Sequence, residues 1–217
     1  VYELCRNKID TLLHFSLDNF QWVARSARET PNTYCESVIE YLRTIFKCLR
    51  SLDEGSKAGL HFSCCGHISE RLVMLVAGKA SDDNDHSQVL DDNSGLRPIS
   101  KIDAYGLKNL SIDVAEFENY ADGTGIPQLR ECFAELKCIT DALLDRELPN
   151  LLMQENENIR RRKYPFLNLE KVVNVLEKYQ GTGLGGKLMG SSSRESSFLM
   201  LEKKDLAHLI KLAKSQI

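Results

Sequence analysis

The sequence predicts an all-α fold, an elongated helical bundle of two stacked subdomains. Apolar residues recur at steps of three and four through successive segments, which is the period of an amphipathic helix. No segment shows the period-two alternation of a β-hairpin, and no repeat of fixed length is present. Hydrophobic residues make up 42% of the 217 residues, which is enough for a continuous core.

The first subdomain is predicted over residues 1–80 and contains three helices. After the first helix, a connecting stretch is expected to be anchored by Phe20, Trp22 and Val23. The second helix is expected to open at Thr30–Pro31, because threonine caps helices and proline is tolerated at the first helical position. The third follows the turn Glu54–Ser56, and so short a connection predicts an antiparallel hairpin. The predicted inward positions are Leu4, Cys5, Ile9, Leu12, Leu13, Tyr34, Val38, Leu42, Ile45, Leu49, Leu52, Phe62, Cys65, Ile68, Leu72, Leu75 and Val76.

The second subdomain is predicted over residues 98–180, after an acidic flexible loop over 81–97 whose aspartates and low hydrophobicity disfavour packing. Helices are expected from Ile102 to Ala121, from Pro127 onward, and after the cap residue Asn168. A Gly/Ser-rich linker is predicted over 181–195, followed by an amphipathic basic helix over 196–217. The predicted inward positions are Ile102, Leu110, Val114, Phe117, Ala121, Leu129, Phe133, Leu136, Thr140, Leu143, Leu144, Val172, Val173, Leu176, Leu206, Leu209, Ile210, Ala213 and Ile217.

Composition excludes several classes of protein. The net charge of −3 lacks the clustered basic excess that nucleic acid requires, so no nucleic-acid partner is expected. No apolar run approaches the roughly 20 residues of a membrane span. The seven cysteines are odd in number and irregularly spaced, which favours a reduced intracellular protein over a disulfide scaffold. Because the chain opens at Val1, we expect it to be part of a longer protein whose targeting signal is not visible.

Two motifs suggest ligand sites, and for each a structural interpretation is preferred. Gly181–Lys187 satisfies a Gly-x-Gly-x-x-Gly pattern, but nucleotide binding needs a preceding strand and a following helix. A flexible linker is the prediction there. Cys64-Cys65-Gly66-His67 with His61 suggests zinc, but adjacent cysteines on a helix point about 100° apart and no second ligand pair follows. Small residues at a close helix contact are the prediction there.

No catalytic constellation is present, so the prediction is a protein that is not an enzyme. Neither a Gly-x-Ser-x-Gly elbow nor an H-E-x-x-H helix occurs. Carboxylates on solvated helix faces do not define an acid–base pair without a pocket. No cofactor, no metal ion and no small-molecule substrate are expected.

Two basic regions leave alternatives open. The cluster Arg160, Arg161, Arg162 and Lys163 is either a solvated loop or a contact for anionic lipid headgroups or a partner. The final helix carries lysines opposite its apolar stripe. It either packs on the bundle or docks on a membrane or neighbouring subunit.

An ordered series of motifs resembles the C-terminal region of exocyst complex component six, the Rab-binding subunit of the exocyst. The similarity runs from Lys8 to Lys178 and departs from the family pattern at the acidic loop, the linker and the last helix. It rests on Trp22, Pro31-x-x-Tyr34, Val38-Ile-Glu-Tyr-Leu42, Cys65-Gly-His67-Ile-Ser69-x-x-Leu72, Leu110-Ser-Ile-Asp113-Val114-x-x-Phe117-Glu118-x-Tyr120-Ala121, Gln128-Leu129, Glu135-Leu136, Arg162-Lys163-Tyr164 and Asn168-x-x-Lys171-Val-Val-x-Val-Leu176-Glu177-Lys178.

The resemblance implies a helical fold of the tethering-complex type and a cytoplasmic subunit, peripheral at secretory vesicles and sites of exocytosis. It implies as partners a GTP-bound Rab GTPase, other exocyst subunits and, peripherally, a membrane. The contact helix by the family's motif is Ile102–Ala121. Its expected outward residues are Lys108, Ser111, Ile112, Ala115 and Glu116. The alternative is a purely structural helical module of a tether or scaffold without GTPase contact.

Overall fold

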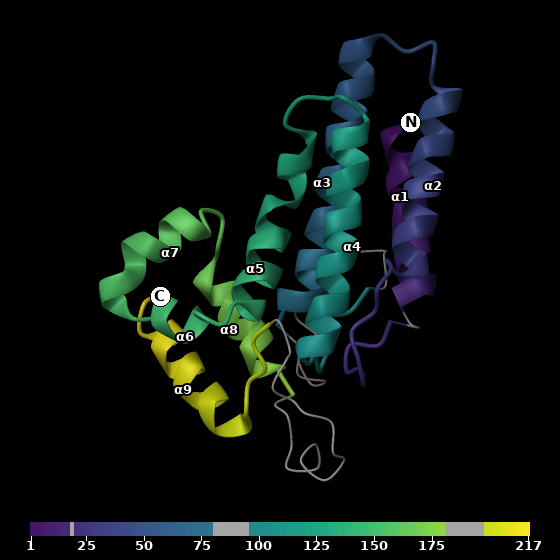
Figure 1. Cartoon of the computed structure of the whole chain (residues 1–217). Coiled ribbons are helices and arrows are strands. Elements are labelled where there is room, and N and C mark those ends of the chain that lie inside the picture. The colour runs from purple at the N-terminus through teal and green to yellow at the C-terminus, as the bar shows by residue number, and fades with distance from the viewer. Residues whose placement is uncertain (18–19, 80–95, 181–197) are drawn as a thin grey trace, which may run out of the picture. The chain divides into compact units, whose positions relative to one another are not determined.

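The computed structural model describes residues 1–17, 20–79, 96–180 and 198–217, with the side chains of residues 15–17 left aside. The all-α prediction is confirmed, because the described residues form helices and irregular connections and no β-strand (Figure 1). Ile102 and Tyr179 make a single isolated parallel bridge. Nearly all of the predicted acidic loop, and the whole of the predicted linker, lie outside the described residues.

The chain divides into two compact units, and their composition differs from the predicted subdomains. Unit 1 comprises Val1–Phe20, Glu29–Pro98 and Ile112–Leu136, and unit 2 comprises Gln21–Arg28, Ile99–Ser111 and Lys137–Ile217. Residues 112–136 therefore belong with the N-terminal helices rather than with the second subdomain. The periodicity of a segment shows which side is buried but not which helix buries it, so it predicts a boundary only at the polar loop.

Unit 1 is built on α3 (Glu54–Ala77), whose residues are buried along most of its length. Helix α1 (Tyr2–Leu17) contacts both α2 (Thr33–Cys48) and α3, and the 3₁₀ helix η2 (Leu129–Phe133) packs on α3. Helices α2 and α3 run antiparallel, as the short connection predicted (Figure 1). The C-terminal part of α4 (Ala104–Gly123) completes the unit.

A chain of aromatic rings fills the centre of unit 1. The Tyr34 ring lies 6.1 Å from that of Phe20 and 6.4 Å from that of Phe117, measured between centroids. Phe117 stacks on Phe133 at 5.4 Å. Each such pair contributes about 0.5–1.5 kcal/mol beyond its buried area. These contacts link the connecting stretch, α2, α4 and η2, and they confirm the predicted anchoring role of Phe20. The same prediction is wrong for Val23, which is 52% exposed.

Helices α2 and α3 each begin within a few residues of the predicted start. Helix α2 begins at Thr33 with Asn32 in the cap position, two residues later than predicted. Asn32 is held there by Asp113, a contact that the local sequence does not reveal. The predicted turn Glu54–Ser56 is the first turn of α3, because Asp53 Oδ1 accepts from Ser56 N at 2.9 Å and caps the helix.

Unit 2 contains the N-terminal part of α4, most of α5 (Ala134–Leu144), and several short helices. These are α6 (Leu148–Leu151), the 3₁₀ helix η3 (Gln154–Asn156), α7 (Glu157–Lys163), α8 (Leu169–Glu177) and α9 (Lys203–Lys214). Asn168 caps α8 as predicted, with its Oδ1 accepting from Lys171 N at 3.2 Å. Helix α9 packs on α8 and buries Leu209 and Ala213.

The irregular segment Gln21–Arg28 lies against the start of α4 within unit 2. Asp103 N donates to Trp22 O at 3.0 Å, and Asp103 Oδ2 accepts from Ala24 N at 3.1 Å. At Gly106 a Cβ atom would stand 2.0 Å from Trp22 O. Only glycine fits this position, because real Cβ atoms do not approach a carbonyl oxygen so closely.

Gly106→Ala is expected to destabilise the protein by about 1–3 kcal/mol, since the added methyl must displace backbone rather than a mobile side chain. Gly59→Ala is the matched control, because Gly59 is also helical and has open space where its Cβ would stand. There alanine should stabilise by up to about 1 kcal/mol. Urea unfolding followed by circular dichroism checks both variants. Equal effects of the two substitutions would contradict the packing described here.

Candidate protein-binding site

Helix α4 carries the predicted binding residues on its solvent side. Leu110, Val114, Phe117 and Ala121 are buried as predicted, and Leu107 is buried as well. Of the predicted outward residues, Ala115 is exposed and the other four are partly exposed. The five are Lys108, Ser111, Ile112, Ala115 and Glu116.

Three of these five residues lie in the part of α4 that belongs to unit 1. They are Ile112, Ala115 and Glu116, whereas Lys108 and Ser111 belong to unit 2. We refer to the first three as the α4 face. Two of them are apolar and reach solvent. Exposed apolar residues are found on protein-binding surfaces, but isolated ones also occur on the surface of most proteins. The assignment of this face to a partner stays a prediction.

The rotation of α4 is fixed by the buried carboxylate of Asp113. Its Oδ1 accepts from Asn32 N at 2.7 Å, and its Oδ2 accepts from Asn32 Nδ2 at 2.9 Å. The Cys35 thiol lies 3.6 Å from the Asp113 carbonyl oxygen, to which it donates. Asp113 is fully buried, and a buried carboxylate is tolerated only when hydrogen bonds satisfy it. Because residues advance by about 100° in a helix, Ala115 then lies on the opposite side, toward solvent.

Two further polar groups lie beside Asp113 in the core. The Tyr34 side chain is buried beside the Asp113 carboxylate. Burial, followed by the nearby Asp113 charge, raises the pKa of Tyr34 well above its usual value. The same two causes raise the pKa of the Cys35 thiol. Both groups are therefore protonated at neutral pH, and neither is suited to act as a base or nucleophile.

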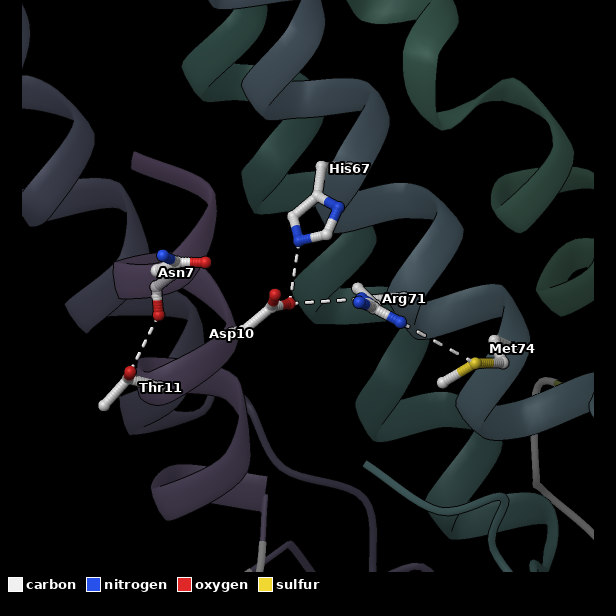
Figure 2. Close-up of polar contacts among 6 residues, drawn as sticks. All are labelled: Asn7, Asp10, Thr11, His67, Arg71 and Met74. Carbon is white, nitrogen blue, oxygen red and sulfur yellow. Dashed lines mark hydrogen bonds and ion pairs between the residues drawn. The ribbon is translucent and has the colours of Figure 1, made fainter. Parts of the chain in front are cut away.

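A second buried polar cluster connects α1 to α3. Figure 2 shows Asp10 of α1 pointing at His67 and Arg71 of α3. Asp10 Oδ1 lies 2.7 Å from His67 Nε2 and accepts from Arg71 Nε at 3.1 Å. All three residues are buried. A carboxylate beside a histidine resembles part of a catalytic triad, but burial denies access to a substrate, so the cluster serves to hold α1 on α3.

The residues of the zinc motif have separate neighbours. His61 stacks on Phe46 at 3.4 Å between centroids and contacts the Tyr120 hydroxyl through Nδ1 at 3.4 Å, whereas His67 binds Asp10. Cys64 and Cys65 are buried, and burial raises the pKa of both thiols. Across the described ranges, no group of three or more His, Cys, Asp and Glu residues is placed to hold a metal ion.

The basic cluster is divided by the structure. Arg160 is buried, and its Nη1 donates to Leu151 O at 3.0 Å and to Gln216. Burial lowers the pKa of this guanidinium from its usual value. Arg161, Arg162 and Lys163 are exposed. The expectation that all four residues share one solvated loop is wrong, because α7 is a helix that turns Arg160 inward while its neighbours face out.

The lysines of the final helix remain at the surface while its apolar stripe is used for packing. Lys214 pairs with Glu177 of α8 at 2.7 Å, and Lys204 pairs with Glu202 at 3.2 Å. Exposed pairs of this kind contribute little stability, about 0–1 kcal/mol each. Of the two expected alternatives, the packing of α9 on its own unit is the one observed.

Comparisons with known proteins agree with the resemblance found in the sequence. Residues 1–90 match a family model described as the exocyst complex subunit Sec15 C-terminal. The chain is similar to two proteins of Arabidopsis thaliana, exocyst complex component SEC15A and exocyst complex component SEC15B. The first is 25% identical over 95% of this chain and the second 21% identical over 97%. The chain spans 25% of the length of each relative.

These similarities support a relation to the C-terminal part of the exocyst subunit Sec15. The designation component six is not tested by them. No solved structure matches the chain. Among the helices described, none is both long and apolar enough to cross a membrane.

Asp10→Ala is expected to lower the free energy of unfolding by about 3 kcal/mol, because it leaves the buried Arg71 charge without this carboxylate. Asn7→Ala is the control on the same helix. Asn7 is exposed, and it binds Thr11 through its backbone oxygen, which the substitution keeps. Its effect should stay within about 0.5 kcal/mol. Chemical denaturation measures both, and a small loss for Asp10→Ala would show that the cluster does not hold α1.

Burial lowers the pKa of His61 to about 4, below the ordinary value near 6.5. As pH falls between these values, the unfolded chain binds a proton that the folded chain does not, so stability declines. The loss attributable to His61 is expected to be on the order of 3 kcal/mol by pH 4. His61→Phe keeps an aromatic ring beside Phe46 and removes the titration. Unfolding free energies from pH 7 to 4.5 should therefore decline less in the variant, and parallel declines would contradict the assignment.

Proposed function

We propose that this chain is a domain of an exocyst subunit of the Sec15 type and acts in vesicle tethering during exocytosis. The observation that carries the proposal is the family match over residues 1–90, extended by similarity to SEC15A over 95% of the chain. The helical fold agrees with it. The proposed setting is the cytoplasm, peripheral at secretory vesicles and sites of exocytosis, with other exocyst subunits as partners. No enzymatic activity is proposed.

The proposed specific task is recognition of a GTP-bound Rab GTPase by the α4 face. In a small GTPase the switch segments are ordered by the γ-phosphate and Mg²⁺ and released on hydrolysis. A rigid helix surface that fits the ordered switch segments binds the GTP form more tightly than the GDP form. This difference in affinity distinguishes the two nucleotide states of the GTPase. The family resemblance assigns Lys108 and Ser111 to the contact as well, but they belong to unit 2, so we rest the proposal on the α4 face alone.

Three features of the α4 face support this proposal. Ile112 and Ala115 offer apolar area to a partner, and apolar anchors near the centre of an interface contribute most of its affinity. Glu116 lies on the same exposed side and accepts from Asn119 Nδ2 at 3.3 Å, so its carboxylate is oriented. The buried Asp113–Asn32 contact keeps the helix from rotating, which reduces the ordering cost of binding.

A pull-down against Rab proteins of secretory vesicles, each loaded with GTP or GDP, tests the proposal. The chain is expected to retain the GTP-loaded form of at least one of them and little of its GDP-loaded form. Ile112→Asp should lower retention by tenfold or more, since hot-spot losses reach about 2 kcal/mol. Because Ile112 is partly buried, Ala115→Arg provides a second test at an exposed site. Alanine and arginine are both good helix formers, so the substitution Ala115→Arg should leave the fold of the domain intact.

The matched control is Ile159→Asp, the same chemical change at an exposed position in unit 2. It should leave Rab retention at the level of the unmodified chain, and circular dichroism should show all three variants helical. Equal retention of GTP-loaded and GDP-loaded forms, or none of either, would favour the alternative of a structural module without GTPase contact.

A further inference from the structure

The second half of α7 and the turn after it gather exposed apolar and basic side chains within unit 2. Ile159 is 56% exposed, Phe166 is 55% exposed and Met153 is 38% exposed. Between Ile159 and Phe166 the chain carries Arg161, Arg162 and Lys163, all of them exposed, and no acidic residue. We call Ile159, Arg161, Arg162, Lys163 and Phe166 the α7 patch.

We propose that the α7 patch docks this domain on an anionic lipid surface. Large apolar side chains enter the boundary between headgroups and acyl chains, while basic side chains remain at the level of the phosphates. Arg161 and Arg162 suit that level, because a guanidinium donates two parallel hydrogen bonds to a phosphate.

The orientation of the patch follows from the burial of Arg160. Arg160 reaches inward to Leu151 O and Gln216 and so fixes the rotation of α7. Ile159, one residue earlier, is turned about 100° away and faces solvent. Arg162 and Lys163 follow Ile159 by three and four residues, which places them beside it on the helix surface. An apolar side chain is thus bordered by two cations.

The charges of the patch remain available to a partner although two of them have ion pairs. Arg161 Nη2 lies 2.6 Å from Glu157 Oε1, but the Arg161 side chain is 75% exposed and such pairs are weak. Lys163 Nζ lies 2.6 Å from Asp145 Oδ2, which also accepts from the Tyr164 hydroxyl at 2.8 Å. Lys163 is therefore the most neutralised member. Arg162, which lies beside Ile159 on the helix surface, contributes most of the attraction. Arg161 follows Ile159 by two residues, so it lies about 200° away around α7 and contributes less.

Charge complementarity favours an anionic bilayer over an acidic protein as the occupant. Carboxylates of an acidic peptide would satisfy the arginines but would not bury Ile159 and Phe166, whereas an anionic bilayer offers phosphates and acyl chains together. The net charge of the chain is −3, so attraction must come from the patch itself and not from the whole molecule. Binding is accordingly expected to be weak and to decrease with salt.

Flotation of the 217-residue chain with vesicles tests the proposal. The probes are phosphatidylcholine vesicles and vesicles of phosphatidylcholine mixed with phosphatidylserine, each at low and at high salt. The chain is expected to float with the mixed vesicles at low salt, and much less with phosphatidylcholine alone or at high salt. Each basic residue is worth about fivefold in partitioning, so Arg162→Ala should reduce binding by roughly fivefold, and Arg161→Ala, on the other side of α7, should reduce it less.

Matched controls separate the patch from general surface charge. Arg43→Ala removes an exposed arginine from unit 1 and should leave flotation unchanged. Phe166→Ser should weaken flotation, whereas Val23→Ser, at a residue that is 52% exposed, should not. Absence of flotation with the mixed vesicles, or equal losses in the test and control variants, would overturn the proposal. The α7 patch and the α4 face share no residue, so failure of flotation would leave the proposed GTPase binding unaffected.

Discussion

The buried carboxylate of Asp113 is the constraint on which the proposed recognition surface depends. It is enclosed in the core of unit 1 and satisfied by two hydrogen bonds from Asn32. A rotation of α4 would leave this charge without those partners in an apolar surrounding, which is costly. The helix therefore has one stable orientation. Ile112 and Ala115 reach solvent as a consequence of that contact, so the proposed recognition surface is already formed in the chain by itself.

Buried polar contacts recur as the means by which single orientations are specified. Asp10 joins α1 to His67 and Arg71 of α3, and Arg160 holds α7 through Leu151 O. Hydrophobic packing alone tolerates sliding and rotation of helices, because apolar contacts are not directional. A charged group placed inside the protein restricts that freedom, since it is stable only beside its partners. In both units, surface residues next to such a group are presented in a defined direction.

Much of the fold was predictable from local pattern, and the rest depended on contacts between distant residues. The apolar period located the helices, and the cap at Asn168 was correct because it involves only residues 168–171. The start of α2 was missed because Asn32 is held by Asp113, 81 residues away. Arg160 was placed with its exposed neighbours, since a run of four basic residues gives no sign of which one turns inward. The membership of residues 112–136 in unit 1 likewise follows from packing partners that periodicity does not identify.

The central claim is that α4 presents a fixed face to a GTP-loaded Rab, and hydrogen–deuterium exchange tests it most directly. The backbone amides around Ile112 and Ala115 should gain protection when the GTP-loaded GTPase is added. They should be unchanged when the same GTPase carries GDP. Protection confined to other helices, or equal protection by both nucleotide forms, would contradict the account.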